Sequence, residues 1–355
     1  MKKPFDLSKF RKDITKSIEG MSIGFSDPTD WISTGNYALN FLISGDFNKG
    51  IPLGKVTVFA GESGAGKSYI CSGNVIRNAQ AQGIFVILID SENALDESWL
   101  KALGVETSED KLLKLNMAMI NDVSKTISTF MKDYKALPQE DRPKVLFVVD
   151  SLGMLMTDIQ VEQFDKGDNK GDFGHKPRQL KTLVTNCVNM FGSNNVGLIA
   201  TNHSYESQDP YSPDPKISGG SGFVYASSIV VAMKKLKLKL DDEGNKVTDV
   251  LGIRAGCKIM KTRYAKPFED IELQIPYETG MNPYSGFFDL LEKRNMIKKE
   301  GNRYCYTDLN GEVHKYFRKE WAKNANGIFD LVMSEFNEKT KSVLPTITDE
   351  EETEE

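Results

Sequence analysis

Residues 55–68 read KVTVFAGESGAGKS, an apolar run of the kind that forms a buried strand, followed at once by a glycine-rich loop. The loop, Gly61–Ser68, matches the pattern GxxxxGK[ST], which cradles phosphates where a strand precedes it and a helix follows. The spacing of apolar residues over 67–81 indicates that helix. Glycines let backbone N–H groups surround phosphates, and a helix N-terminus favours their negative charge. The stretch therefore predicts a nucleotide-binding β–α unit.

The residues of this loop have distinct expected tasks in binding ATP and Mg²⁺. We expect Lys67 to reach the outer phosphates and the Ser68 hydroxyl to ligate Mg²⁺. The rest of the loop and the residue after it complete the expected cofactor site: Glu62, Ser63, Gly64, Ala65, Gly66 and Tyr69. The alternative is a chance match on a glycine-rich turn, and the flanking strand and helix argue against it.

Three further apolar runs have the character of the first. They are IFVILID at 84–90, VLFVVD at 145–150 and VGLIATN at 196–202, each ending in a polar residue. Strands that are apolar on both faces belong in a parallel sheet covered by helices. Helical spacing recurs between the runs, as at 120–136 and 178–191. The alternation predicts a doubly wound α/β fold with a mostly parallel central sheet, whose ligands bind at the carboxyl ends of the strands.

Polar side chains at these strand ends are candidates for the chemistry. Asp150 can hold Mg²⁺ through water, with helix capping as the alternative. Glu92 can orient and polarise an attacking water, unless it is a solvated surface acid. His203 can contact the γ-phosphate, although a lone histidine is more often structural. Asp96 and Trp99 follow at helical spacing and can hold adenine by a hydrogen bond and stacking, whereas a core position is the alternative for Trp99.

The remainder of the chain divides by composition. Residues 1–20 have the spacing of a short amphipathic helix, with a break at 24–28. After residue 228 we expect strands at 228–233, 257–260 and 270–275, with a turn at 241–245, as an antiparallel or mixed extension of the sheet. Residues 284–335 are expected to be mostly helical, with a small basic hairpin near 298–306. Two polar, glycine-containing segments, 157–177 and 204–222, are expected to be long loops, which are commonly functional in compact domains.

Composition excludes several classes of protein. The chain has 39% hydrophobic residues and no apolar run of membrane-spanning length, and its start resembles no secretory signal. Four separated cysteines show no metal-ligand spacing, so we expect reduced thiols in a cytoplasmic protein: Cys71, Cys187, Cys257 and Cys305. The net charge is −5, but residues 349–355 carry six acids. Without this tail, which we expect to be disordered, 45 basic residues face 44 acidic ones, so charge does not argue against nucleic acid.

These motifs together resemble the RecA/Rad51 class of strand-exchange recombinases, most closely the UvsX-type recombinases of tailed phages. The matching text begins with WISTGNYALNFLISGDFNKGIPLGKVTVFAGESGAGKS and continues with LIDSENALDESWLKALGV and VLFVVDSLGML. It ends with LIATNHSYESQ, KISGGSGFVYASS and KTRYAKPFEDIELQIPYETG. The resemblance covers roughly residues 30–295, and its combination of motifs is far more specific than the phosphate loop alone.

The resemblance implies a RecA-like ATPase core that polymerises on single-stranded DNA as a helical filament, with ATP at the boundary between protomers. It implies that Lys261 and Arg263 complete the neighbouring protomer's site in the manner of an arginine finger, and that Tyr277 lies against the base. The DNA-binding loops would be residues 154–177 and 204–222. The implied DNA contacts are Arg178, Ser204, Tyr205, Gly219, Gly220 and Ser221.

The sequence also departs from the bacterial pattern. Bacterial members carry Gln where this chain has His203. The first loop is acidic, and no clear match to the bacterial C-terminal domain is visible after residue 296. We expect residues 1–29 to form a helix and linker that contact a neighbouring protomer, 30–283 the core, 284–344 a C-terminal region and 345–355 the tail.

The predicted function is DNA-dependent ATP hydrolysis with homologous pairing and strand exchange. Expected partners are single-stranded DNA, homologous duplex DNA, further copies of the chain, a recombination mediator and a single-strand binding protein, in the cytoplasm (the host's, if phage-encoded). The main alternative is a RecA-fold hexameric helicase, which usually carries an N-terminal collar domain. A non-catalytic coating protein and a P-loop metabolic kinase are weaker alternatives.

Overall fold

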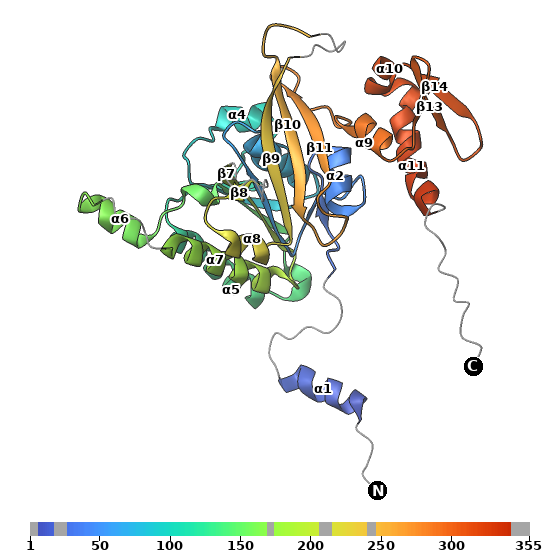
Figure 1. Ribbon diagram of the computed structural model, residues 1–355. Helices are drawn as coiled ribbons and strands as arrows, with labels where there is room; N and C mark the ends of the chain where they lie inside the picture. The colour runs from blue at the N-terminus through green and yellow to red at the C-terminus, as the bar shows by residue number, and fades with distance from the viewer. Residues whose placement is uncertain (1–5, 18–26, 169–173, 206–214, 240–245, 342–355) are drawn as a thin grey trace, which may run out of the picture.

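A mixed sheet forms the centre of the molecule in the computed structural model, which describes residues 6–17, 27–168, 174–205, 215–239 and 246–341. Its strand order is β11-β10-β9-β3-β7-β6-β4-β5 (Figure 1). The strands from β9 to β5 run parallel, and β10 is antiparallel to both of its neighbours. The bounds are β3 Val56–Gly61, β4 Phe85–Asp90, β5 Leu112–Asn116, β6 Val145–Asp150, β7 Val196–Tyr205, β9 Ile229–Leu238, β10 Gly252–Lys261 and β11 Asp270–Pro276. The predicted α/β class with a mostly parallel sheet is confirmed.

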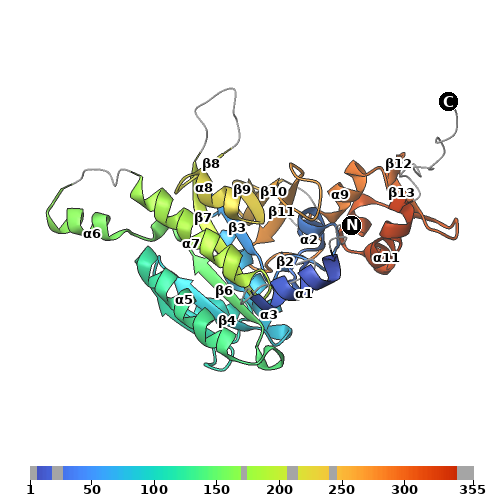
Figure 2. The same ribbon diagram turned by 90° about the horizontal axis from the view of Figure 1, so that it is seen from below.

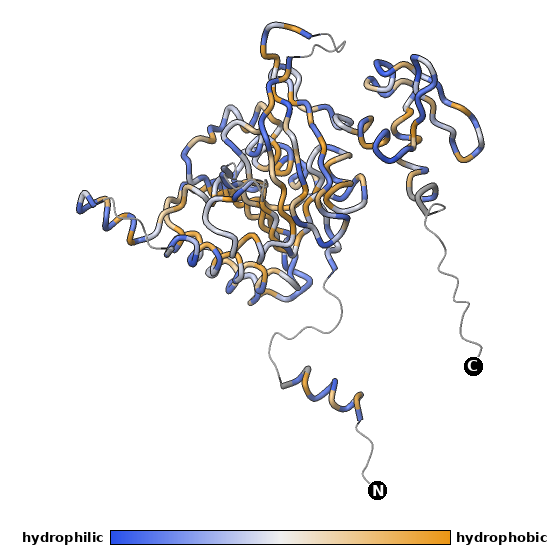
Figure 3. The backbone as a smooth tube through the Cα atoms, viewed as in Figure 1, coloured by the Kyte–Doolittle hydropathy of each residue, from blue (hydrophilic) through white to orange (hydrophobic). Residues whose placement is uncertain are grey.

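Helices cover both faces of this sheet, as its doubly apolar strands require. One face packs against α5 Ile120–Ala136, α7 His175–Phe191 and α8 Ser221–Ala226. The other packs against α2 Tyr37–Ser44, the π-helix η1 Tyr69–Val75 and α3 Ile76–Ala81. Apolar segments accordingly gather in the sheet (Figure 3). The helix predicted over 67–81 is therefore a π-helical turn continued by an α-helix.

Shorter elements complete the described core. They are α1 Leu7–Ser17, α4 Glu97–Ala102, η2 Gln139–Asp141, η3 Leu152–Met154, and the strands β1 Trp31–Ile32, β2 Ile51–Pro52 and β8 Lys216–Ile217. β1 pairs with β2, and β8 pairs with the end of β7. The N-terminal helix predicted within residues 1–20 is present as α1.

The first long loop was expected to lack regular structure over 157–177, and this is wrong. Helix α6, Asp158–Asp165, begins with a capping box in which Thr157 and Gln160 satisfy each other's backbone N–H groups. This helix projects from the body of the molecule (Figures 1 and 2), and Phe164 on it is 83% exposed. Helix α7 already begins at His175. The capping signal was readable in the sequence, but the glycines around it favoured a loop.

The C-terminal residues form helices around a small antiparallel sheet. Their elements are α9 Phe287–Lys293, β12 Lys298–Glu300, β13 Arg303–Thr307, β14 Val313–Tyr316, α10 Arg318–Ala322, η4 Ala325–Gly327 and α11 Ile328–Lys341. The expected hairpin near 298–306 is thus a three-stranded sheet, ordered β12-β13-β14. The Phe336 ring on α11 contacts the rings of Phe41 and Phe47, whose centroids lie 4.8 and 5.0 Å away, so this region shares the core of α2.

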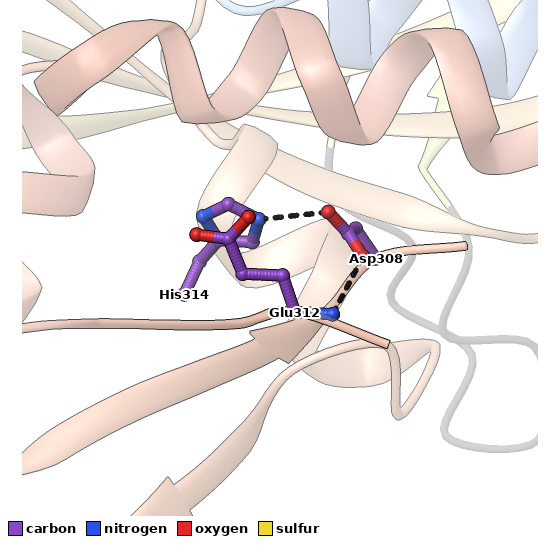
Figure 4. A group of neighbouring side chains, drawn as sticks. All are labelled: Asp308, Glu312 and His314. Carbon is purple, nitrogen blue, oxygen red and sulfur yellow. Dashed lines mark hydrogen bonds and ion pairs between the residues drawn. The ribbon is translucent and has the colours of Figure 1, made fainter. Parts of the chain in front are cut away.

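The turn between β13 and β14 is closed by a carboxylate. Asp308 accepts hydrogen bonds from the backbone N–H groups of Asn310 and Glu312, and its other oxygen lies 3.2 Å from His314 Nε2 (Figure 4). One ligand atom from each of Asp308, Glu312 and His314 lies within 4.8 Å of the others. Nearby, the buried Glu335 of α11 accepts from Tyr306 Oη and Leu309 N. These bonds fix the hairpin to α11.

Several expectations concern residues outside the described ranges. The turn at 241–245, most of the break at 24–28, the middle of each long loop and the acidic tail at 349–355 lie there. Within the part of the chain that is described, no helix combines the length and apolarity needed to cross a membrane.

The buried amide of Asn40 gives a test of this fold. Its Oδ1 accepts from Thr34 N and Oγ1, and its Nδ2 donates to Ser33 Oγ and Phe47 O. Asn40→Ala should lower the free energy of unfolding by roughly 3 kcal/mol, because buried partners lose their bonds. Urea denaturation measures this, with the exposed Asn48→Ala as the control, expected within about 0.5 kcal/mol of wild type. Equal stability of the two variants would show that the amide network does not support α2.

Candidate active site

The phosphate loop lies at the carboxyl end of β3, directly before η1. Lys67 Nζ donates to Gly61 O at 2.9 Å and to Glu62 O at 2.8 Å, so the ammonium curls back over its own loop. Burial lowers the pKa of Lys67, against the raising effect of the nearby Asp150 and Glu92 carboxylates. The lysine is therefore held beside both acids that the sequence singled out.

Glycine is required at the end of this loop for two reasons. Gly66 has φ +90°, and a Cβ there would lie 3.0 Å from Ile275 Cδ1 and 3.1 Å from Ile253 Cδ1.

The phosphate loop also contacts β9, because Glu62 Oε1 accepts a hydrogen bond from Lys235 N at 2.7 Å. Glu62 therefore anchors the loop to the sheet, a role that its place in the motif did not reveal.

Asp150 ends β6 beside the P-loop helix. Its Oδ2 accepts from Ser72 Oγ at 2.8 Å, and its Oδ1 accepts from Thr201 Oγ1. The Ser68 hydroxyl makes no capping hydrogen bond and lies about one helical turn before Ser72. Hydroxyl and carboxylate oxygens suit Mg²⁺, which keeps several waters of its own. The donor set therefore fits the ion that the loop motif implies.

Glu92 and His203 come together next to Asp150. Glu92 Oε1 accepts from Ser151 Oγ at 2.7 Å and lies 3.3 Å from His203 Nε2. Both side chains are about one-third exposed, 33% for Glu92 and 37% for His203, so solvent and ligands can reach them. Ser151 was missed by the sequence analysis, although it directly follows a strand-end acid.

Asp90 organises the segment that carries Glu92. It is fully buried, and its carboxylate accepts from the backbone N–H groups of Glu92, Ala94 and Leu95. Lys114 Nζ lies 3.0 Å from its Oδ2. The sequence showed Asp90 only as the end of a strand. The fold of the following turn gives Asp90 its second role, because that turn brings three backbone N–H groups to its carboxylate.

The candidate base-binding residues have different surroundings. Asp96 N-caps α4, and hydrogen bonds from Ser98 Oγ and Trp99 N lower the pKa of its carboxyl group. Trp99 is half-buried and packs against the core below it. Tyr277 follows β11 and is 68% exposed.

Tyr69 has a structural task at this site. Its Oη accepts from Met281 N at 2.9 Å, and a Cβ on Gly280 would lie 2.6 Å from that oxygen. The P-loop helix is thereby tied to the turn that begins at Tyr277. The hydroxyl acts here as an acceptor, and its own proton can still be donated to another group.

Lys261 and Arg263 lie far from the phosphate loop of their own chain. Lys261 pairs with Val230 at the start of β9, and its Nζ donates to Tyr225 O. Arg263 acts electrostatically on Lys55, which directly precedes β3, whereas the phosphate loop follows that strand. Six strand residues span about 20 Å. Arg263 therefore stands near the opposite end of β3 from Gly61, and the Lys261 ammonium reaches towards the same end, to Tyr225 shortly before β9.

The last residues of β7 connect this site to the second long loop. Asn202 Nδ2 donates to Ser218 O, and Ser218 N donates to His203 O. Ser204 and Tyr205 continue as a ladder with β8. The strand that carries His203 thus holds both ends of the loop.

The predicted DNA-contacting glycines lie against α7. Gly219 and Gly220 both have φ +87°, and a Cβ on them would approach Leu180 and Pro177. Arg178 is exposed on the same helix, and Ser221 begins α8. The glycines are therefore also needed for the close approach of α8 to α7.

Comparisons with known proteins agree with this arrangement. The family model described as RecA N-terminal domain matches residues 15–282. "Protein RecA" of Rhodococcus jostii (strain RHA1) is 26% identical over 336 residues, 94% of this chain and 90% of that protein. "Protein RecA" of Clostridioides difficile (strain 630) is 26% identical over 85% of this chain and 81% of its own length. The corresponding protein of Bdellovibrio bacteriovorus is 27% identical over 79% of this chain and 68% of its own length.

The buried Asp90 carboxylate gives a test of this geometry. Asp90→Ala should lower the free energy of unfolding by on the order of 3 kcal/mol, because Lys114 and three backbone N–H groups lose their partner. Asp96→Ala is the matched control, since it removes an exposed N-cap worth about 1 kcal/mol. Chemical denaturation of both variants measures the difference. Equal losses would mean that Asp90 is an ordinary cap and does not organise the Glu92 segment.

Proposed function

Because the chain belongs to the RecA N-terminal domain family, we propose that it is a DNA-dependent ATPase that polymerises on single-stranded DNA and catalyses homologous pairing and strand exchange. The observation that carries this proposal is the meeting of Lys67, Asp150, Glu92 and His203 at the carboxyl ends of four parallel strands. The strand that carries His203 continues into a candidate DNA loop. A hexameric helicase, the main alternative, is not favoured, since the relatives are named RecA over most of this chain.

ATP would occupy the phosphate loop with Mg²⁺. Backbone N–H groups of residues 62–69 would surround the phosphates, and Lys67 would exchange its carbonyl partners for phosphate oxygens. Mg²⁺ would be held by Ser68 and, through water, by Asp150, and it neutralises charge on the phosphates. Asp96, Trp99 and Tyr277 would hold the adenine.

Glu92 is the proposed acceptor for the attacking water. Its Oε1 is fixed by Ser151 and lies beside His203, and its backbone N–H is fixed by Asp90. A carboxylate held in this way orients the water and accepts its proton. His203 would sense the γ-phosphate and pass the signal along β7 to Ser218 and the second loop.

Lys261 and Arg263 would act on the site of a neighbouring protomer. Their position supports this, because Arg263 acts on Lys55 at the start of β3 and the Lys261 ammonium contacts Tyr225 before β9, whereas the phosphate loop follows the far end of β3. Cations there would stabilise charge on the departing γ-phosphate. ATP hydrolysis would then require assembled protomers. Helix α1 is the proposed contact to the neighbour.

DNA binding is assigned to two segments, 154–177 and 204–222. The proposed contacts are Arg178, Ser204, Tyr205, Gly219, Gly220 and Ser221. We further propose that the chain is of the UvsX type, that a mediator and a single-strand binding protein act with it, and that it works in the cytoplasm. The histidine at 203, where bacterial members carry glutamine, supports the phage branch.

The proposed chemistry is tested by ATP hydrolysis with and without single-stranded DNA. DNA should stimulate the wild type, and Lys67→Ala should abolish nucleotide binding. Glu92→Gln should keep ATP binding and slow hydrolysis by about 100-fold or more, because the water loses its proton acceptor. Glu97→Gln, an exposed acid in α4, is the control and should hydrolyse ATP normally. Normal turnover in Glu92→Gln would remove this residue from the mechanism.

The shared site is tested by mixing inactive variants. Lys261→Ala and Lys67→Ala should each be inactive alone, and mixing them should restore some ATPase activity where an intact loop meets an intact finger. The double variant, mixed with either single one, is the control and should restore nothing. If co-assembled filaments of the two single variants, seen by electron microscopy, show no rescue, hydrolysis is confined to one protomer.

A further inference from the structure

Both carboxylate oxygens of Asp150 accept hydrogen bonds from side-chain hydroxyls. Ser72 Oγ donates to Oδ2 at 2.8 Å, and Thr201 Oγ1 donates to Oδ1 at 2.5 Å. Ser72 and Thr201 are fully buried, and Asp150 is 5% exposed. The three side chains come from three elements, η1, β6 and β7. The carboxylate is thus held from two sides inside the protein.

Each donor owes its position to a distinct feature of the chain. Thr201 follows Ala200, which pairs with Val149, so the parallel register sets it beside Asp150. Ser72 lies on the π-helical turn that follows the phosphate loop. π-Helical segments are rare and are frequently found at functional sites. The phosphate-loop helix and the strand that leads to His203 therefore meet at one carboxylate.

A buried threonine hydroxyl in this sheet does not always need a partner. Thr57 on β3 is also fully buried, and among the described residues its Oγ1 has no hydrogen-bond partner. Satisfying a hydroxyl is therefore not a sufficient reason for the bond from Thr201. The bond instead serves its acceptor, the Asp150 carboxylate, by fixing its orientation. A carboxylate that receives two hydrogen bonds still has lone pairs free for a further ligand.

We propose that Ser72 and Thr201 are positioning residues, which clamp Asp150 in the orientation that serves Mg²⁺. This inference rests on the proposed nucleotide function of the site. Groups that orient a metal-binding carboxylate commonly change metal affinity by 10–100-fold when they are removed. Loss of one hydroxyl should therefore weaken the part of nucleotide binding that depends on Mg²⁺ and leave the Mg²⁺-independent part unchanged.

The experiment measures binding of a fluorescent ATP analogue to the full chain during a Mg²⁺ titration and in EDTA. Thr201→Val should raise the Mg²⁺ concentration for half-maximal strengthening of binding by about tenfold. Thr201→Ser keeps the hydroxyl and should behave as wild type. Thr57→Val is the matched control, because it makes the same change of atoms in a buried strand threonine without a hydrogen bond. All variants should bind alike in EDTA.

The outcomes separate the clamp from the underlying function. A wild type that responds to Mg²⁺, together with a Thr201→Val that responds equally, overturns the clamp alone. Equal losses in Thr201→Ser and Thr201→Val also overturn it, because the hydroxyl would then be irrelevant. Absence of nucleotide binding in the wild type overturns the nucleotide proposal and the clamp with it, whereas binding that is indifferent to Mg²⁺ overturns the Mg²⁺ site and the clamp and leaves the nucleotide proposal standing. If Thr201→Val does not fold, Ser72→Ala decides the matter, with the same expected shift.

Discussion

Two buried carboxylates end neighbouring parallel strands, and the rest of the site depends on how they are held. Asp90 and Asp150 are paired residues at the ends of β4 and β6. A buried carboxylate is costly unless hydrogen bonds or an opposite charge compensate for the lost water. Asp90 receives three backbone N–H groups and Lys114, which turns the following segment so that Glu92 points back to the site. Asp150 receives two hydroxyls and lies near the Lys67 ammonium. One acid therefore shapes the backbone, while the other is left facing the nucleotide.

The same strand ends give a physical route from the phosphate loop to the second long loop. Thr201, Asn202 and His203 are consecutive on β7 and have three different tasks: the first donates to Asp150, the second bonds to Ser218, and the third lies beside Glu92. Alternate residues of a strand point to opposite faces, so one short segment can contact Asp150, Glu92 and the second loop at the same time. A small change at the γ-phosphate would alter bonds that hold the ends of the second loop.

Much of this site could be predicted because its determinants are local in sequence. The sheet and the places of Lys67, Asp150, Glu92 and His203 could be predicted from three local features. These are the loop motif, the doubly apolar strands and the polar residues at the strand ends. The partners of these residues could not be predicted in the same way. Ser72, Ser151 and Lys114 become partners only through strand order and register, and no short motif marks them. Helix α6 was missed for a different reason, because nearby glycines outweighed the capping box at Thr157.

The position of the basic residues explains why ATP hydrolysis and assembly would be coupled. Within one protomer the phosphate loop has the Lys67 ammonium over it, whose pKa burial lowers, and the Lys235 ammonium against Gly64. Lys261 and Arg263 lie near Lys55, and burial and the neighbouring Arg263 charge both lower the pKa of Lys261. The nearby Asp27 carboxylate offsets part of this repulsion at Lys55, and the phosphates of a neighbour's ATP would offset it further. Binding ATP at the boundary would then relieve repulsion on one protomer while it neutralises charge on the other, so the nucleotide itself would strengthen the filament contact.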